Sequence, residues 1–202
     1  IRDLMYTGFD ERIIAERAGP WQSAAARIHG LLATGNVRLT AGTSVGKTVI
    51  AFHVAELVGR TLFFVPKRVI SPSHRELFGM VWGNMLGVRT ITGASGLAER
   101  VWNDACDQVI FSTAHVFVEE CARGRVDVNR FRLFVLDEGH HATGRHAYVH
   151  AEFLARSAGI PLLVITPDGA SESFLETIDS QLEVRHLEDL SGHTGDFKNI
   201  VT

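Results

Sequence analysis

The sequence predicts an α/β fold in which a mainly parallel sheet carries helices on both faces. Two observations lead to this prediction. Short apolar runs rich in β-branched and aromatic residues recur along the chain, and segments with helical patterning separate them. Apolar residues make up 46% of the 202 residues, which is enough to cover both faces of such a sheet.

Residues 1–36 are expected to form a helical segment ahead of the first strand. Two amphipathic stretches lie here, Glu11 to Arg17 and Ser23 to Leu32. They flank Gly19-Pro20, a pair that favours a break between two helices because proline lacks a backbone N–H group. We therefore expect two short helices in this segment.

From residue 37 to residue 190, apolar runs that fit strands alternate with helical patterns. The expected strands are Val37 to Thr40, Leu62 to Val65, Val88 to Ile91, Val109 to Phe111, Phe131 to Leu136, Leu162 to Ile165 and, at an edge, Leu182 to His186. The tail, residues 191–202, is polar and contains glycine, like the start of a linker. One α/β unit is therefore expected over residues 37–190.

A glycine-containing loop joins the first expected strand to an apolar helix that ends before Gly59, a residue suited to a C-cap. Its backbone N–H groups and the helix N-terminus would present positive charge to the phosphates of ATP. Lys47 would add a full charge at the β- and γ-phosphates, and the Thr48 hydroxyl would bind Mg²⁺. The candidate nucleotide-binding residues of this loop are Thr43, Ser44, Val45, Gly46, Lys47 and Thr48.

The same loop supports a second interpretation. Gly42-Thr43-Ser44-Val45-Gly46 also fits the nucleophile elbow of α/β-hydrolases, with Ser44 as nucleophile and Asp137 and a later histidine as its partners. Lys47-Thr48 directly after it favours phosphate binding instead. Against the phosphate-loop pattern, Ala41 stands where glycine is expected.

Gln22 stands ahead of this loop in the sequence. Its side-chain amide would either contact the edge of the adenine base or act as a solvated helix cap. The residue alone favours the cap, and its place before a phosphate loop favours the contact with adenine.

Polar and charged residues follow the expected strands, at the edge where parallel sheets bind ligands. Asp137-Glu138-Gly139-His140 follows the run that ends at Leu136. Asp137 would hold Mg²⁺ through water, and Glu138 would orient and deprotonate the attacking water. His140 would sense the γ-phosphate. The alternative is an ordinary turn that contains two acids.

Several other features of the sequence narrow the classes of function to consider. His146 and His150 share a helical face, but no acid or cysteine stands at zinc-ligand spacing inside the pair, which argues against zinc. The net charge of −3 gives no global basic field for nucleic acid, although a local strip of contacts needs none. Two cysteines favour a reducing compartment, and no apolar run is long enough to span a membrane.

These motifs resemble the first RecA-like lobe of superfamily 2 DExH helicases over nearly the whole chain. Gly46-Lys47-Thr48 resembles motif I, and Asp137 to His140 resembles motif II. The run from His140 to Tyr148 is closest to that of the archaeal Hef and Fanconi M-type translocases, whose relatives include innate-immune RNA-sensing helicases. The resemblance implies a RecA-like P-loop fold, with Gln22 in the position of the family's adenine-reading motif.

The resemblance also implies contact with the backbone of DNA, or of RNA. The matching positions are Lys67, Arg68, Thr92, Gly93 and Thr113, although a solvated loop is the alternative for Lys67 and Arg68. Of motif III, which couples hydrolysis to strand movement, only Thr166 matches cleanly, because Pro167-Asp168 replace the usual residues.

The implied function is the ATP-binding lobe of a DNA helicase or translocase that acts on branched or forked DNA. The family's second RecA-like lobe, which supplies arginines to the nucleotide site, would be the partner of this one. The departures leave open a catalytically weak module that binds nucleotide and nucleic acid, or an RNA-acting lobe. Such a protein is expected in the cytoplasm, or in the nucleus of a eukaryotic cell.

Overall fold

The computed structural model describes residues 11–42, 46–66, 87–96, 98, 100–143 and 146–190. Its centre is a seven-stranded sheet in the order β3-β4-β2-β5-β6-β1-β7, and all the pairs of neighbouring strands are parallel. The strands are β1 (Asn36–Ala41), β2 (Thr61–Phe64), β3 (Gly87–Ile91), β4 (Asp107–Ser112), β5 (Leu133–Leu136), β6 (Leu162–Pro167) and β7 (Val184–Asp189). This arrangement confirms the predicted parallel α/β fold.

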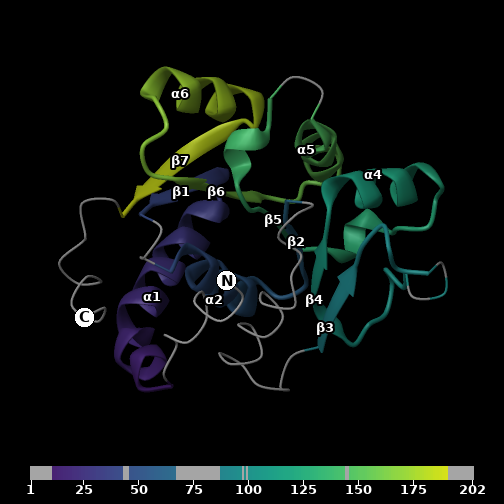
Figure 1. The fold of residues 1–202 in the computed structure, drawn as a ribbon, viewed down its shortest axis with the longest axis horizontal. Helices are drawn as coiled ribbons and strands as arrows, with labels where there is room; N and C mark the ends of the chain where they lie inside the picture. The colour runs from purple at the N-terminus through teal and green to yellow at the C-terminus, as the bar shows by residue number, and fades with distance from the viewer. Residues whose placement is uncertain are drawn as a thin grey trace, which may run out of the picture.

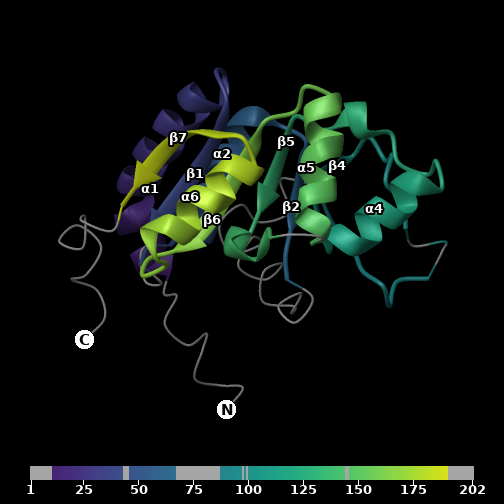
Figure 2. The ribbon, with the colours of Figure 1, turned by 90° about the horizontal axis from the view of Figure 1, so that it is seen from above.

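Helices cover both faces of this sheet (Figures 1 and 2). On one face lie α1 (Glu11–Leu32) and α2 (Lys47–Val58), and on the other lie α4 (Ala114–Ala122), α5 (Ala147–Ser157) and α6 (Glu172–Gln181). Two short 3₁₀ helices, η2 (Val128–Arg130) and η3 (Gly139–His141), stand before and after β5. No helix in the described part of the chain is both long and apolar enough to cross a membrane.

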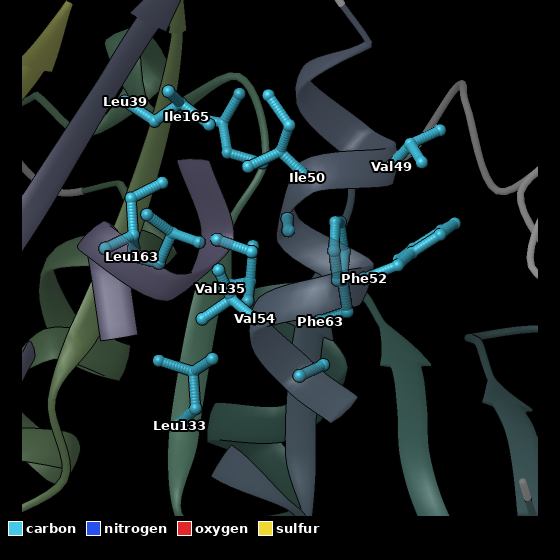
Figure 3. Close-up of a cluster of buried hydrophobic side chains, with 14 of the residues drawn as sticks. Leu39, Val49, Ile50, Phe52, Val54, Phe63, Leu133, Val135, Leu163 and Ile165 are labelled. Atoms are coloured by element: carbon cyan, nitrogen blue, oxygen red, sulfur yellow. The ribbon is translucent and has the colours of Figure 1, made fainter. Parts of the chain in front are cut away.

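The sheet separates two hydrophobic cores because successive side chains of a strand point to opposite faces. Phe63 and Val135 pack under α1 and α2, whereas Phe64 and Phe134 pack on the opposite face under α4 and α5. Figure 3 shows the first core, in which Phe52 of α2 meets Phe63 edge-on with ring centroids 5.5 Å apart. The near-continuous apolar strands of the sequence are thus explained by burial on both faces.

Helix α1 corrects the prediction of two helices broken at Gly19-Pro20, because it runs unbroken through Pro20. Trp21, Ala24, Ala25 and Ile28 are all buried, at the spacing of a single helical face. This face belongs to the same core as α2 and the sheet. Its burial compensates for the backbone hydrogen bond that proline removes, so the helix continues.

All seven expected strands are present, but most of their ends differ from the prediction by one or two residues. The expected edge strand, Leu182 to His186, is instead Val184–Asp189, because Leu182 caps the end of α6. Strand β5 begins at Leu133 and not at Phe131, because the N–H group of Phe131 bonds to Val128 O and closes the turn of η2. Strand β7 lies at an edge of the sheet as expected and pairs with β1. The carboxyl ends of β1, β5 and β6 therefore lie next to one another.

Candidate functional site

The loop between β1 and α2 is held by a close contact with α1. Gly46, the residue before α2, has the left-handed backbone angles φ 85° and ψ 36°. A Cβ atom at this position would lie only 2.9 Å from Nε1 of the buried Trp21 indole. Glycine is therefore required here for two reasons, its backbone conformation and the packing of Trp21. Thr43, Ser44 and Val45 lie outside the described residues.

Lys47 begins α2, and its ammonium group turns back onto the loop. Its Nζ atom donates to Ala41 O at 2.5 Å and to Gly42 O at 3.0 Å. Burial lowers the pKa of Lys47, and the negative charges of Asp168, Glu138 and Asp137 partly oppose that shift. These three carboxylates therefore act on the charge of Lys47 at the start of α2.

The acidic pair follows β5, as predicted. Asp137 is 8% exposed, and its backbone N–H donates to Phe64 O of the neighbouring strand at 3.0 Å. The buried Tyr148 of α5 donates its hydroxyl hydrogen to Asp137 O at 2.7 Å. Two neighbouring elements, β2 and α5, therefore fix the backbone of Asp137 at the sheet edge.

Glu138 has a backbone conformation that is unusual for a residue other than glycine, with φ 54°. Its side chain is 43% exposed, and its Oε2 atom lies 3.2 Å from Nδ1 of His140. Burial lowers the pKa of His140, and the neighbouring His141 lowers it further, while Glu138 and Asp137 act in the opposite direction. A neutral His140 therefore stands beside a partly solvated carboxylate.

Asp168 is a residue that the sequence interpretation did not place in the nucleotide site. It follows β6, its N–H donates to Ala41 O at 3.3 Å, and its charge leads those that raise the pKa of Lys47. The sequence signal was present, because Asp168 follows a buried strand at the ligand-binding edge. Its closeness to Lys47 required the strand order, in which β6 lies next to β1.

Of the other predicted residues, Thr166 is buried within the sheet, whereas Gln22 is exposed on α1. Thr166 is fully buried, and its hydroxyl lies 3.0 Å from that of Thr40, which links β6 to β1. Gln22 lies inside α1 and is exposed, so the interpretation as a residue that caps the start of a helix is wrong. Thr48 lies in the first turn of α2 and is partly exposed.

Three of the five predicted nucleic-acid residues come together. Thr92, Gly93 and Thr113 line one groove of about 600 Å³ at the carboxyl ends of β3 and β4, with Ala94, His115, Val116 and Glu119. The Thr113 side chain caps α4 by accepting from Val116 N at 3.4 Å. Lys67 and Arg68 lie outside the described residues.

A buried ion cluster holds one wall of this groove. Glu120 of α4 is fully buried, and Arg100 donates to its Oε1 atom at 3.1 Å. Arg100 also donates to the backbone oxygens of Gly93 and Ser95, at 3.3 and 3.1 Å. The loop that carries Thr92 and Gly93 is therefore tied to α4.

The two alternative chemistries are a zinc site at His146 and His150 and a hydrolase with Ser44 as its nucleophile. His146 caps α5 by accepting from Tyr148 N, and His150 is exposed. Within the described ranges, no group of three or more histidine, cysteine or acidic side chains is arranged to hold a metal ion. The Ser44 hydrolase interpretation falls on a loop residue outside those ranges.

Comparisons with known proteins agree with this geometry. The family model described as "Type III restriction enzyme, res subunit" matches residues 22–160. The ATP-dependent DNA helicase mph1 of Aspergillus terreus is 29% identical over 172 residues, which are 77% of this chain and 16% of that protein. A putative ATP-dependent RNA helicase of Methanocaldococcus jannaschii is 26% identical over 153 residues, 72% of this chain and 20% of that protein.

A solved structure shows the same fold. The Hef helicase domain of Pyrococcus furiosus superposes with a TM-score of 0.73 at 26% identity, covering 88% of this chain and 39% of that one. The chain thus spans well under half of the proteins it matches. It belongs to the family described as type III restriction enzyme res subunits, and its fold is the first RecA-like lobe of a superfamily 2 helicase.

Proposed function

We propose that this chain is the ATP-binding lobe of an ATP-dependent DNA helicase or translocase that acts on branched or forked DNA. The observation that carries the proposal is that Lys47 follows β1 and the acidic pair Asp137-Glu138 follows β5 at one edge of the sheet, where both carboxylates act on the charge of Lys47. The proposed nucleotide site would share this edge with the groove of Thr92 and Thr113. ATP hydrolysis and movement along a strand would be coupled across it.

The residues at this edge suit a nucleoside triphosphate such as ATP. Left-handed Gly46 precedes α2, and the positive end of that helix's dipole lies at Lys47. The Lys47 ammonium would exchange the carbonyls of Ala41 and Gly42 for the β- and γ-phosphates, which are stronger acceptors because they are charged. Thr43, Ser44 and Val45 would complete the loop around the phosphates, and Gln22 would contact adenine.

Asp137 and Thr48 offer a carboxylate and a hydroxyl oxygen as ligands for Mg²⁺. Hard cations of this kind prefer oxygen ligands. The bound ion would neutralise charge on the transferring phosphoryl group. Asp137 is well fixed for this role by the hydrogen bonds from Asp137 N to Phe64 O and from Tyr148 to Asp137 O.

Glu138 would act as the general base in hydrolysis. Its partly exposed carboxylate would accept a proton from the attacking water, and His140, 3.2 Å away, would sense the γ-phosphate through it. Thr166 would respond to the state of the nucleotide site through its contact with Thr40 of β1. These roles follow the family resemblance and the positions of the side chains.

The strand would lie in the groove of Thr92, Gly93 and Thr113, with Lys67 and Arg68 as further contacts. Hydroxyl and backbone groups of this kind bind sugar and phosphate, so binding would be insensitive to base sequence and sensitive to salt. The mph1 relatives are DNA helicases by name, which favours DNA over RNA. Such a protein would work in the cytoplasm, or in the nucleus of a eukaryotic cell.

The second RecA-like lobe of the family would complete the site. Arginines supplied across such a cleft accelerate phosphoryl transfer by about 10³–10⁵-fold in related enzymes. The 202-residue chain alone is therefore expected to bind Mg·ATP weakly and to hydrolyse it very slowly.

The test is the Glu138→Gln variant in a longer chain that includes the second lobe. Glutamine keeps the shape of the side chain and removes the base, so Mg·ATP binding should persist while phosphate release falls by about 10²-fold or more. Hydrolysis by the variant at the wild-type rate would show that Glu138 is not the group that activates water.

One observation favours a second candidate, a lobe that binds nucleotide and strand with little turnover. Asp168 adds a third carboxylate near Lys47, where it would oppose the phosphates of ATP. Asp168→Ser in the two-lobe chain separates the candidates. An Asp168→Ser variant that hydrolyses ATP much faster than the wild type would favour the weakly active module.

A further inference from the structure

A second cavity, of about 190 Å³, adjoins the strand groove. It lies where α4 and α5 begin, beside the carboxyl end of β2. Its lining includes Val65, Pro66, Thr113, His115, His141 and His146. Thr113 and His115 also line the strand groove, so the two spaces adjoin at these residues.

Three imidazole rings from three separate elements meet at this cavity. His115 lies in the first turn of α4, His141 ends η3, and His146 caps α5. The ring centroids of His115 and His146 are 6.2 Å apart, and those of His141 and His146 are 6.4 Å apart. His115 and His141 are exposed and therefore accessible to a ligand.

One tautomer of the neutral His146 ring is favoured. Its Nδ1 atom accepts a hydrogen bond from Tyr148 N at 3.2 Å, so the proton of the neutral ring is on Nε2. Burial lowers the pKa of His146, and His115 and His141 lower it further, which favours the neutral ring. In that form the Nε2–H group of His146 is a hydrogen-bond donor between two accessible histidines.

The spacing of the rings suits a phosphate group better than a metal ion. Two imidazoles on one zinc ion, with bonds of about 2.0–2.1 Å, would have ring centroids about 5 Å apart. A phosphate group accepts N–H donors at about 2.8 Å on several oxygen atoms, so rings on either side of it are roughly 6–8 Å apart. The observed 6.2 and 6.4 Å fall in the second range.

We propose that His115, His141 and His146 form a subsite for one backbone phosphate of the bound strand. This subsite lies one step along the track from Thr92, Gly93 and Thr113, and it rests on the proposed nucleic-acid function. The ligand is a strand phosphate and not a free ion, because the cavity adjoins the strand groove at Thr113 and His115.

The carboxylates around the cavity already have partners. Glu119 of α4 is paired with Arg123 at 2.6 Å, and Glu138 lies 3.2 Å from His140 on the side of η3. Burial raises the pKa of Tyr148, whose hydroxyl donates to Asp137 O.

The test measures the affinity of the 202-residue chain and of its His115→Ala/His141→Ala variant for a fluorescent oligothymidylate. The double variant should bind about three- to tenfold more weakly, because it loses two N–H donors to one phosphate. Its fold should persist, because both side chains are exposed.

The matched control is His150→Ala, which removes an exposed histidine of α5 outside the cavity lining and should keep the wild-type affinity. If the double variant binds the oligonucleotide as tightly as the wild type, the subsite is refuted while the strand groove stands. If the wild type binds no oligonucleotide, the nucleic-acid function fails and the subsite fails with it. If inorganic phosphate at the same concentration displaces the strand only from the wild type, a free-ion site replaces the strand subsite.

Discussion

Gly139 gives a sharp test of how the acidic pair is positioned. This residue follows Glu138 directly, and a Cβ atom placed on it would lie 2.2 Å from Cγ1 of Val164, a fully buried residue of β6. Carbon atoms in contact are normally about 3.5–4.0 Å apart, so one of the two must move by more than about 1 Å. Strands β5 and β1 flank Val164 through Leu136 and Arg38, so its backbone has little room to shift.

Gly139→Ala should therefore lower the free energy of unfolding by about 1–3 kcal/mol, the usual cost of overpacking. Val164→Ala alone removes two buried methyl groups and should cost about 2–3 kcal/mol. In the double variant the added methyl group has room. Its loss of unfolding free energy should therefore be smaller, by about 1–3 kcal/mol, than the sum of the two single losses.

Urea unfolding followed by the fluorescence of the buried Trp21 and Trp102 measures these values. Gly30→Ala is the matched control, because its Cβ would meet nothing within 4 Å and alanine favours a helix by about 0.5–1 kcal/mol. Additive effects of Gly139→Ala and Val164→Ala would refute the contact between motif II and β6. In the two-lobe chain, Gly139→Ala should also slow ATP hydrolysis, because it displaces Glu138.

Two further predictions concern α4. Burial alone would raise the pKa of Glu120, but hydrogen bonds from three arginines lower it below the ordinary 4.5. The arginines are Arg123, Arg100 and Arg125. Glu120→Ala should cost about 2–4 kcal/mol in urea unfolding. The stability that the Glu120 carboxylate contributes should be fully present above pH 4.5 and should be lost as the pH falls through its lowered pKa. The Glu120→Ala variant should lack this loss of stability below pH 4.5, which would confirm that Glu120 causes it. Burial, together with the charge of Glu120, raises the pKa of Cys121 to about 12. Iodoacetamide at pH 8 should therefore modify the exposed Cys106 and leave Cys121 unmodified, as measured by mass spectrometry. Equal labelling of the two cysteines would contradict the burial of Cys121.

Much of the fold was predictable because its signals are local. Strands buried on both faces appear as apolar runs, and Gly59 closes α2 as predicted, with its N–H bonded to Ala55 O. Local signals misled at Pro20, where burial of a helical face outweighed the loss of one hydrogen bond. The late start of β5 arose in the same way, from a 3₁₀ turn that competes for the N–H group of Phe131.

The candidate site was predictable in its motifs but not in its neighbours. Asp137 and Lys47 were identified by their place after strands, because parallel strands bring their carboxyl ends to one edge. The closeness of Asp168 to Lys47 and the packing of Trp21 against Gly46 depend on strand order and on the path of α1. A sequence pattern contains neither of these, so no motif indicated them.

The nucleotide site is tested most directly by calorimetric titration of Mg·ATP into the chain and its Lys47→Ala variant. Removing one charge-assisted contact with phosphate should weaken binding by about 10- to 100-fold. The fold should persist in the variant, because Lys47 is only partly buried and bonds to two loop carbonyls.

Arg132→Ala is the control, because this exposed cation precedes β5 at the opposite edge of the sheet. We predict that the control binds Mg·ATP as the wild type does and that Lys47→Ala loses most of its affinity with little change in its urea midpoint. Equal affinity of the wild type and Lys47→Ala for Mg·ATP would contradict the assignment of this edge as a nucleotide site.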